Sequence, residues 1–217
     1  MSRLKISLRQ ITAVLVASLL IITLSGCSIL APDSSPAPQT TADEDAPPDA
    51  PGNLVFSQFD GSFDFASGVG AWLTSVNIAP DGSFTGSFTD PNMSETGPGY
   101  PKGTMLICKF QGQLELVEQV DEFEYLLALV DISQEGTIGD EKIDDGFLFR
   151  VNGPYGFENA DKFSLYAPGH PVDTLPEPFL EWMRMPMWIP DDAETLPGWG
   201  LYNINTEEGF FSDQSGV

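Results

Sequence analysis

Alternation between apolar and polar residues is the clearest pattern in the chain after residue 70. Residues 72–78 alternate as expected for a half-buried strand, with three apolar side chains on one face: Trp72, Val76 and Ile78. Residues 80–83 read Pro-Asp-Gly-Ser, which is typical of a turn. Over residues 83–89, phenylalanine and glycine alternate with hydroxyl residues. The two alternating runs and the turn between them predict a β-hairpin.

Short strand patterns continue along the rest of the chain, in six segments: residues 104–110, 114–117, 122–131, 147–151, 162–166 and 199–204. Residues 91–103 are rich in glycine and proline and predict a loop. Residues 179–185, between Pro178 and Pro186, have a pattern typical of a helix. Many short strands separated by turns predict an all-β fold, an antiparallel meander barrel with one short helix near the C-terminus. A β-sandwich is the alternative.

The N-terminus has a different pattern, a short basic segment followed by an apolar run. Three basic residues precede the run and no acidic residue accompanies them: Arg3, Lys5 and Arg9. Residues 11–24 are apolar, but the run is shorter than the roughly 20 residues that a membrane-spanning helix needs. This layout predicts a secretory signal peptide over residues 1–26.

The apolar run ends at Leu24-Ser25-Gly26-Cys27. This tetrapeptide resembles the lipobox of bacterial lipoproteins, in which an apolar residue and two small residues precede a cysteine. The resemblance implies cleavage before Cys27 and a diacylglyceryl thioether on Cys27, whose two acyl chains, palmitate among them, suffice for stable anchoring. The expected location is the extracytoplasmic face of the cell membrane. The alternative is an uncleaved signal anchor that ends in a cysteine by chance.

Residues 27–52 form a third compositional region, rich in Pro, Ala, Asp, Ser and Thr. This region has too few apolar residues to bury a core, and we expect a disordered tether that follows the lipidated Cys27. Its acidic side chains repel anionic headgroups and hold the domain away from the membrane. Residues 53–217 are long enough for one β-rich domain.

The chain is strongly acidic, with a formal net charge of −23. Loss of the three basic residues of the signal peptide takes this charge to −26. Such a charge argues against a nucleic-acid partner but is compatible with cations, basic peptides or neutral ligands. The alternative interpretation is that the charge serves only the solubility of an exported domain.

Two local resemblances add to this picture. Gly70-Ala71-Trp72 resembles the G-x-W signature of lipocalin-like (calycin) barrels, which implies that Trp72 packs across the closed end of a barrel. Residues 72–112, which include the sequences DGSFTG and YPKGT, resemble lipoproteins of Gram-positive bacteria. The second resemblance brings no activity with it.

Metal chemistry has one candidate loop, in which oxygen-bearing side chains stand close together: Asp90, Asn92, Ser94 and Glu95. Calcium prefers several oxygen ligands from a flexible loop. The spacing lacks the glycine and the distal glutamate of an EF-hand, so a solvated turn is the alternative. Residues 140–145 hold a second acidic cluster. The sequence points to no other cofactor.

Single reactive residues give little support for catalysis. His170, the one histidine, lies in a turn sequence and has no nucleophile motif near it. Cys108 lies between Leu106 and Phe110 on one strand face and is expected to be a buried apolar residue rather than a catalytic thiol. With Cys27 lipidated, Cys108 has no partner for an intrachain disulfide.

The C-terminal segment contains large adaptable side chains that are candidates for ligand binding: Trp182, Met185 and Trp188. The alternative is that this segment closes one end of the barrel. The expected function is therefore a non-catalytic module that binds a small ligand or an envelope component. An exported hydrolase that uses carboxylates is the alternative. A wide interior lined by Trp72, Phe84, Phe88 and Phe110 would indicate a ligand, and a filled interior would indicate a protein partner.

Overall fold

The computed structural model describes residues 55–58, 62–68 and 71–212. These residues belong to the second of the two units into which the chain divides, residues 45–217. The predicted signal peptide, the lipobox cysteine Cys27 and the predicted tether lie outside the described residues.

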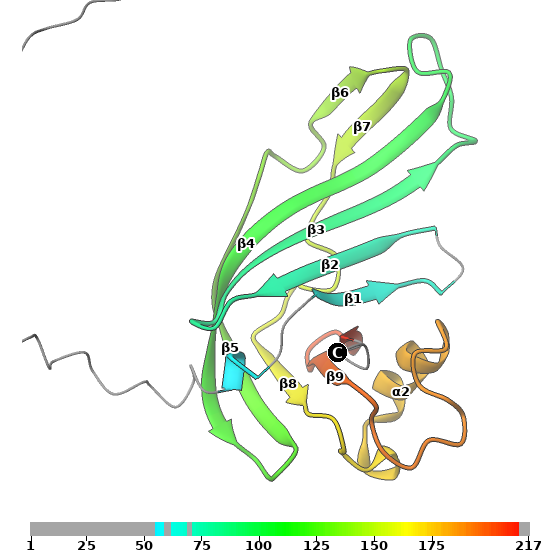
Figure 1. The fold of residues 1–217 in the computed structure, drawn as a ribbon. Coiled ribbons are helices and arrows are strands. Elements are labelled where there is room, and N and C mark those ends of the chain that lie inside the picture. The colour runs from blue at the N-terminus through cyan, green and yellow to red at the C-terminus, as the bar shows by residue number, and fades with distance from the viewer. Residues whose placement is uncertain (1–54, 59–61, 69–70, 213–217) are drawn as a thin grey trace, which may run out of the picture. The chain divides into compact units, whose positions relative to one another are not determined.

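Ten strands are present in the described part of the chain: β1 (Ser62–Ala66), β2 (Leu73–Ile78), β3 (Ser83–Asn92), β4 (Gly103–Gln119), β5 (Glu124–Gln134), β6 (Glu141–Asp144), β7 (Phe147–Val151), β8 (Lys162–Tyr166), β9 (Trp199–Asn203) and β10 (Glu208–Ser212). A 3₁₀-helix, η1 (Val172–Thr174), and an α-helix, α2 (Glu177–Arg184), follow β8. Figure 1 shows how the strands curve around a common interior.

Eight of the strands described here form a closed antiparallel barrel. Each of β1 to β4 pairs with the strand that follows it, β5 pairs with β8, and β8, β9 and β10 continue the meander. The ring closes where Asp64 of β1 pairs with Phe211 of β10. The prediction of a meander barrel is therefore confirmed, and the sandwich alternative is wrong.

The hairpin of β6 and β7 is an addition to this ring. β7 runs parallel to the first part of β4, where Gly103 pairs with Phe147, whereas β5 pairs with the second part of β4 from Phe110 onward. The long β4 therefore serves two neighbours in succession. The β6–β7 hairpin projects beyond the barrel, together with the C-terminal end of β3 and the N-terminal end of β4 (Figure 1).

Alternation explains the interior core, the cluster of buried side chains inside the barrel. Phe84 and Phe88 of β3 are 2% and 4% exposed, whereas the hydroxyl residues between them face outward. Two glycines make room for aromatic rings on the neighbouring strand: Gly86 pairs with Phe110 and Gly112 pairs with Phe84. A Cβ on Gly86 would lie 2.3 Å from the Phe110 ring. Glycine is therefore required here by close packing.

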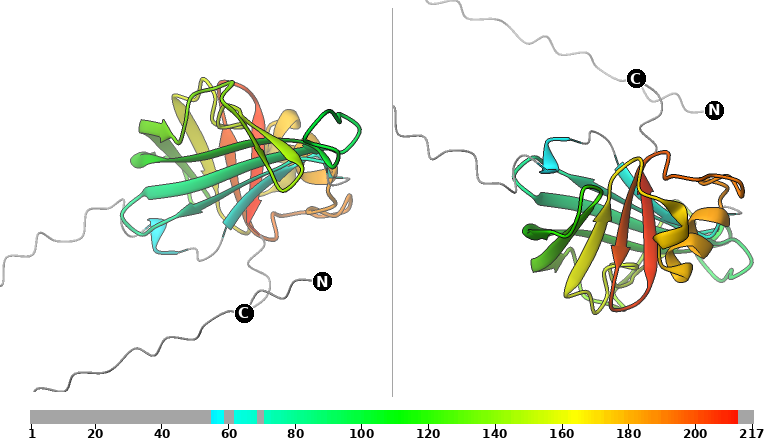
Figure 2. Two further views of the ribbon diagram at one scale, coloured as in Figure 1. Left: turned by 90° about the horizontal axis from the view of Figure 1, so that it is seen from above. Right: turned by 90° about the horizontal axis from the view of Figure 1, so that it is seen from below.

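A second cluster, the outer core, lies on the opposite face of β8, β9 and β10. Residues 167–198, the cap segment, cover this face. Both views in Figure 2 show α2 beside β9 and β10. Phe179 of α2 is fully buried between Tyr166 and Tyr202, with ring centroids 5.1 and 5.8 Å away. The predicted helix is present, shifted slightly toward the N-terminus, because Pro176 and Pro178 fit the first turn of a helix.

Candidate functional site

The barrel interior is occupied by residues 152–161, the plug loop, which connects β7 to β8. Phe157 is 2% exposed and packs against four phenylalanine rings at centroid distances of 5.1, 5.4, 4.8 and 5.4 Å: Phe84, Phe110, Phe163 and Phe210. Tyr155 contacts Trp72 at 4.9 Å and Phe88 at 5.4 Å. All four residues expected to line an open cavity therefore contact the plug loop instead.

Polar contacts hold the plug loop in place. Thr74 Oγ1 donates to the Tyr155 carbonyl at 2.9 Å, and Asn203 Nδ2 donates to the Gly156 carbonyl at 3.0 Å. Both side chains are fully buried, so these bonds satisfy groups that would otherwise be costly to bury. Gly156 has a φ of 92°, and a Cβ there would lie 2.5 Å from the Phe210 ring. The loop is therefore an integral part of the core.

Two glutamates bring carboxyl groups to this region, Glu158 of the plug loop and Glu208 of β10. Glu158 Oε2 accepts a hydrogen bond from the Gly156 amide at 2.9 Å, and Glu208 lies at the start of β10 and accepts one from the Thr206 hydroxyl. Burial, followed by the negative charge of Glu158, raises the pKa of Glu208 to about 7. A carboxyl group with such a pKa can hold or release a proton near neutrality.

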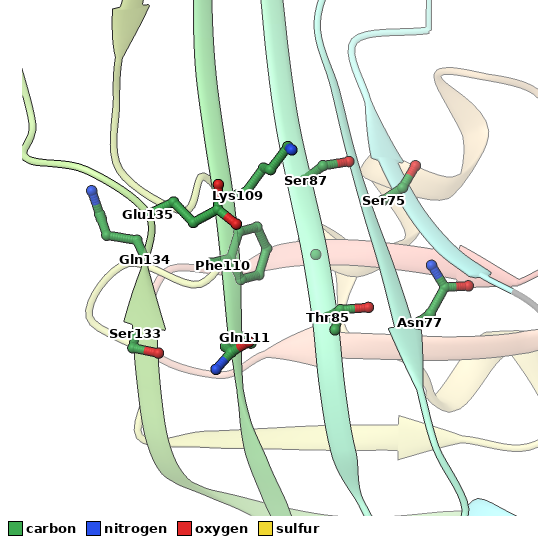
Figure 3. Close-up of a pocket in the computed structure, with 11 residues that line it drawn as sticks. Ser75, Asn77, Thr85, Ser87, Lys109, Phe110, Gln111, Ser133, Gln134 and Glu135 are labelled. Carbon is green, nitrogen blue, oxygen red and sulfur yellow. The ribbon is translucent and has the colours of Figure 1, made fainter. Parts of the chain in front are cut away.

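The outer face of β2 to β5 carries a polar depression, the outer groove (Figure 3), lined by Ser75, Asn77, Thr85, Ser87, Lys109, Gln111, Ser133 and Glu135. Three adjoining hollows follow β3 and β4, with volumes of about 420, 530 and 410 Å³. The groove arises from strand geometry, since the residues that alternate with the interior aromatics are hydroxyl and amide residues.

Lys109 is the cation of the outer groove. Its side chain projects into the groove beside Ser87 and Glu135 in Figure 3. Among the described residues Lys109 has no carboxylate within 4.0 Å, whereas Lys102, Lys142 and Arg150 all form ion pairs. The groove therefore combines uncharged hydrogen-bonding groups with one cation, Lys109, and one carboxylate, Glu135.

The three predicted ligand-binding residues do not converge. Trp182 packs on Phe65 at 4.8 Å and donates its indole N–H to the Glu207 carbonyl at 2.9 Å. Trp188 stacks on Phe211 in the outer core at 5.9 Å. Met185 ends α2 and is 52% exposed. The two tryptophans thus attach the cap segment to the barrel, and their role in ligand binding stays a prediction.

The predicted calcium loop spans the end of β3 and the turn after it. Asn92 Oδ1 already accepts from the Ser94 hydroxyl at 2.7 Å and from the Ser94 amide at 3.2 Å. Glu95 lies 3.6 Å from Arg150. Three of the four predicted calcium ligands, Asn92, Ser94 and Glu95, therefore have hydrogen-bond or ion-pair partners in this structure. Calcium binding at Asp90, Asn92, Ser94 and Glu95 stays a prediction.

The second acidic cluster is divided among separate partners. Asp144 pairs with Lys142 at 2.7 Å and Asp145 with Lys102 at 2.9 Å. Glu141 pairs with Arg150 at 2.8 Å. These contacts fasten the β6–β7 hairpin to itself and to the start of β4.

The two candidate reactive residues are both buried. Cys108 is 2% exposed in the interior core, and burial raises the pKa of its thiol to about 11. This agrees with the expected structural role of Cys108, because the reactive thiolate form is disfavoured. His170 is 5% exposed, with its ring 5.1 Å from that of Tyr166.

Three comparisons with known proteins found no match. No family model, curated protein or solved structure matches the chain. Within the described ranges, no helix has the length and apolar character needed to cross a membrane.

The sequence patterns do not identify the outer groove or the plug loop. The hydroxyl residues at alternate positions of residues 83–89 mark the groove in retrospect, because each faces away from a core aromatic. The plug loop contains Gly153, Pro154 and Gly156, which are typical of a surface turn. Its insertion into the barrel depends on contacts with strands far away in sequence.

Proposed function

We propose that this chain is a lipid-anchored extracytoplasmic protein whose barrel is a non-catalytic binding module for an envelope component. The observation that supports the proposal is the filled interior, since a partner must then bind on the outer surface, where the outer groove is a concave polar site among the described residues. A lipocalin-like carrier function would need an interior that the plug loop does not leave.

A filled interior alone would indicate a protein partner, but the chemistry of the outer groove favours a hydroxyl-rich, sparsely charged polymer such as a glycan strand. Thr85 and Ser87 offer hydroxyl groups that both donate and accept, and Gln111 offers an amide. The Ser75 hydroxyl, which donates to Asp64 Oδ1 at 2.5 Å, offers an acceptor. Lys109 can attract a carboxylate or phosphate on such a polymer. A densely anionic polymer is disfavoured because the chain as a whole carries a charge of −23.

The binding proposal is tested with isolated cell-wall polysaccharide as the probe. Thr85→Trp places a bulky ring in the groove, and Lys109→Ala removes its cation. We expect binding in a sedimentation assay to weaken by at least about tenfold in Thr85→Trp and by less in Lys109→Ala. Val117→Trp, at an exposed position of β4 outside the groove, is the matched control. Equal binding by all four proteins would exclude the groove as the binding surface.

The anchoring proposal rests on the lipobox sequence that ends at Cys27. Cys27→Ala should abolish incorporation of labelled fatty acid and leave the precursor unprocessed in the producing cell. The substitution lies outside the folded domain that begins near Val55, so this domain should fold normally and accumulate to the same level. Normal labelling and maturation of Cys27→Ala would show that the chain is anchored differently.

The carboxyl pair of Glu158 and Glu208 favours a second candidate, an exported hydrolase. A protonated Glu208 would serve as the general acid. Release of reducing ends from the same polysaccharide, lost in Glu208→Gln and Glu158→Gln, would support this candidate. Absence of any release by the wild-type chain would leave binding as the function.

A further inference from the structure

His170 lies where the cap segment leaves β8, and its environment resembles that of a metal ligand. Its ring is 5% exposed and lies between the rings of Tyr166 and Phe123, at 5.1 and 6.4 Å. Nδ1 donates to the Pro171 carbonyl at 3.0 Å. This hydrogen bond places the proton of the neutral ring on Nδ1 and leaves Nε2 as a lone-pair donor. In metal sites the second ring nitrogen is commonly fixed in this way.

Two carboxylates from the β4–β5 turn face this histidine. One carboxylate oxygen each from Asp121 and Glu124 and one ring nitrogen of His170 all lie within 4.8 Å of one another. Asp121 Oδ1 is held by the amides of Phe123 and Glu124, at 2.7 and 2.8 Å. Glu124 Oε1 is held by the Ser164 hydroxyl at 2.8 Å. Each carboxylate therefore keeps a second oxygen for another partner.

We propose that Asp121, Glu124 and His170 form a binding site for a divalent transition-metal ion such as Zn²⁺. In the part of the chain that the structure describes, His170 has no carboxylate within 4.0 Å, so the three groups are not joined as an ion pair. Zinc–ligand distances of about 2.0–2.2 Å require only a small inward movement of the exposed turn. The His170 side chain is buried and its Nδ1 is bonded to the Pro171 carbonyl, so Nε2 is the nitrogen that remains for a metal ion.

The donor set selects among cations. Calcium prefers six to eight oxygens, whereas one imidazole and two carboxylates suit zinc and similar ions. Three protein ligands leave a coordination position for water or for a group on a partner. Because Asp121 and Glu124 come from the barrel and His170 comes from the cap segment, a bound ion would join these two parts.

The site is tested by calorimetric titration of the purified full chain with Zn²⁺, after treatment with a chelator. We expect one equivalent to bind, and we expect Asp121→Asn and His170→Gln to weaken binding by at least about tenfold. Asp121→Asn keeps the oxygen that accepts the two turn amides, so the turn should remain folded. Glu122→Gln, an exposed neighbour outside the site, should bind Zn²⁺ like the wild type.

Four results would overturn the proposal. The first is the absence of Zn²⁺ binding, and the second is equal loss of affinity in Glu122→Gln and Asp121→Asn, which would indicate a diffuse acidic surface. The third is unchanged affinity in Asp121→Asn. The fourth is Ca²⁺ that competes with Zn²⁺ at equal concentration, because an oxygen-only site would then account for binding. A melting temperature that rises with Zn²⁺ in the wild type but not in Asp121→Asn would support the site independently.

Discussion

The interior core and the outer core lie on opposite faces of the same three strands but are built differently. The interior core is enclosed on all sides by strands, and the plug loop fills its centre through Phe157. The outer core is covered from one side only, by the cap segment around Phe179. Side chains at the margin of the outer core, such as Met185 and Met187, are 52% and 85% exposed.

This difference explains two kinds of strand sequence. β2 and β3 face solvent on one side, and their buried residues alternate with exposed ones. β8 and β9 are covered on both sides and read as nearly continuous buried runs. A short continuous run in this chain therefore marks a strand under the cap segment, whereas alternation marks a strand with a free outer face.

The sharpest way to break the interior core is Phe157→Ala. Because Phe157 fills the centre of the barrel, its truncation should lower the free energy of unfolding by about 3–5 kcal/mol. Denaturant unfolding measures the change. Phe149→Ala, at a partly exposed position of β7, is the matched control and should cost about 1 kcal/mol. A cost for Phe157→Ala no larger than that of the control would show that the plug loop is not part of the core.

Phe179→Ala tests whether the outer core is an independent layer. Phe179 is fully buried in the outer core. Its truncation should lower the free energy of unfolding by about 3 kcal/mol, because the cap segment covers one side only and can partly collapse into the space that the ring leaves. Amide hydrogen exchange should become faster in residues 167–198, whereas strands that do not contact the outer core, such as β2, should keep their protection. Uniformly faster exchange would indicate that the two cores unfold as one unit.

Trp72→Ala tests the link between the two regions. Trp72 is partly buried and packs on Phe65 of the interior core at 4.7 Å and on Trp182 of α2 at 6.1 Å. We expect a loss of about 2 kcal/mol in denaturant unfolding, below the range for a fully buried aromatic residue. A loss well under about 1 kcal/mol would remove Trp72 from the barrel end that the G-x-W resemblance assigns to it.

The smallest expected effect concerns pH. The folded pKa of Glu208, about 7, is above its ordinary value of 4.5, so between these two pH values the folded chain binds more protons than the unfolded chain. Its contribution to stability is therefore complete below pH 4.5 and is lost as the pH rises through 7. Allowing for residual solvent exposure, the loss should be about 1 kcal/mol. Glu208→Gln should remove this dependence, measured as unfolding free energy at pH 5 and pH 8.

Local patterns predict much of the barrel because alternation survives wherever one strand face meets solvent. The β2–β3 hairpin is predicted in this way from residues 72–78 and 83–89. The strands over residues 147–151 and 162–166 are predicted with the bounds that the structure shows, although β8 is covered on both sides and does not alternate. β6 has four exposed residues and hence no apolar pattern to detect. β10 is short, and its buried phenylalanines face both cores, so neither period is visible.

The candidate sites are harder to predict because they depend on distant contacts. Phe157 lies in a sequence rich in turn residues, and only Phe84 and Phe110 on other strands make it a core residue. His170 has no ligand-like residue beside it in the sequence. Its candidate partners, Asp121 and Glu124, come from a turn that the β5–β8 pairing brings close.

The pairing of Asp64 with Phe211 has a consequence for how the chain folds. The ring closes between the first and the last of the described strands, and the plug loop follows β7 late in the chain. Contacts between residues so far apart in sequence make folding slow, because most of the chain must be ordered before they form. Until β10 pairs with β1, the aromatic faces of β1 to β5 stay open to other chains, which exposes the folding chain to aggregation.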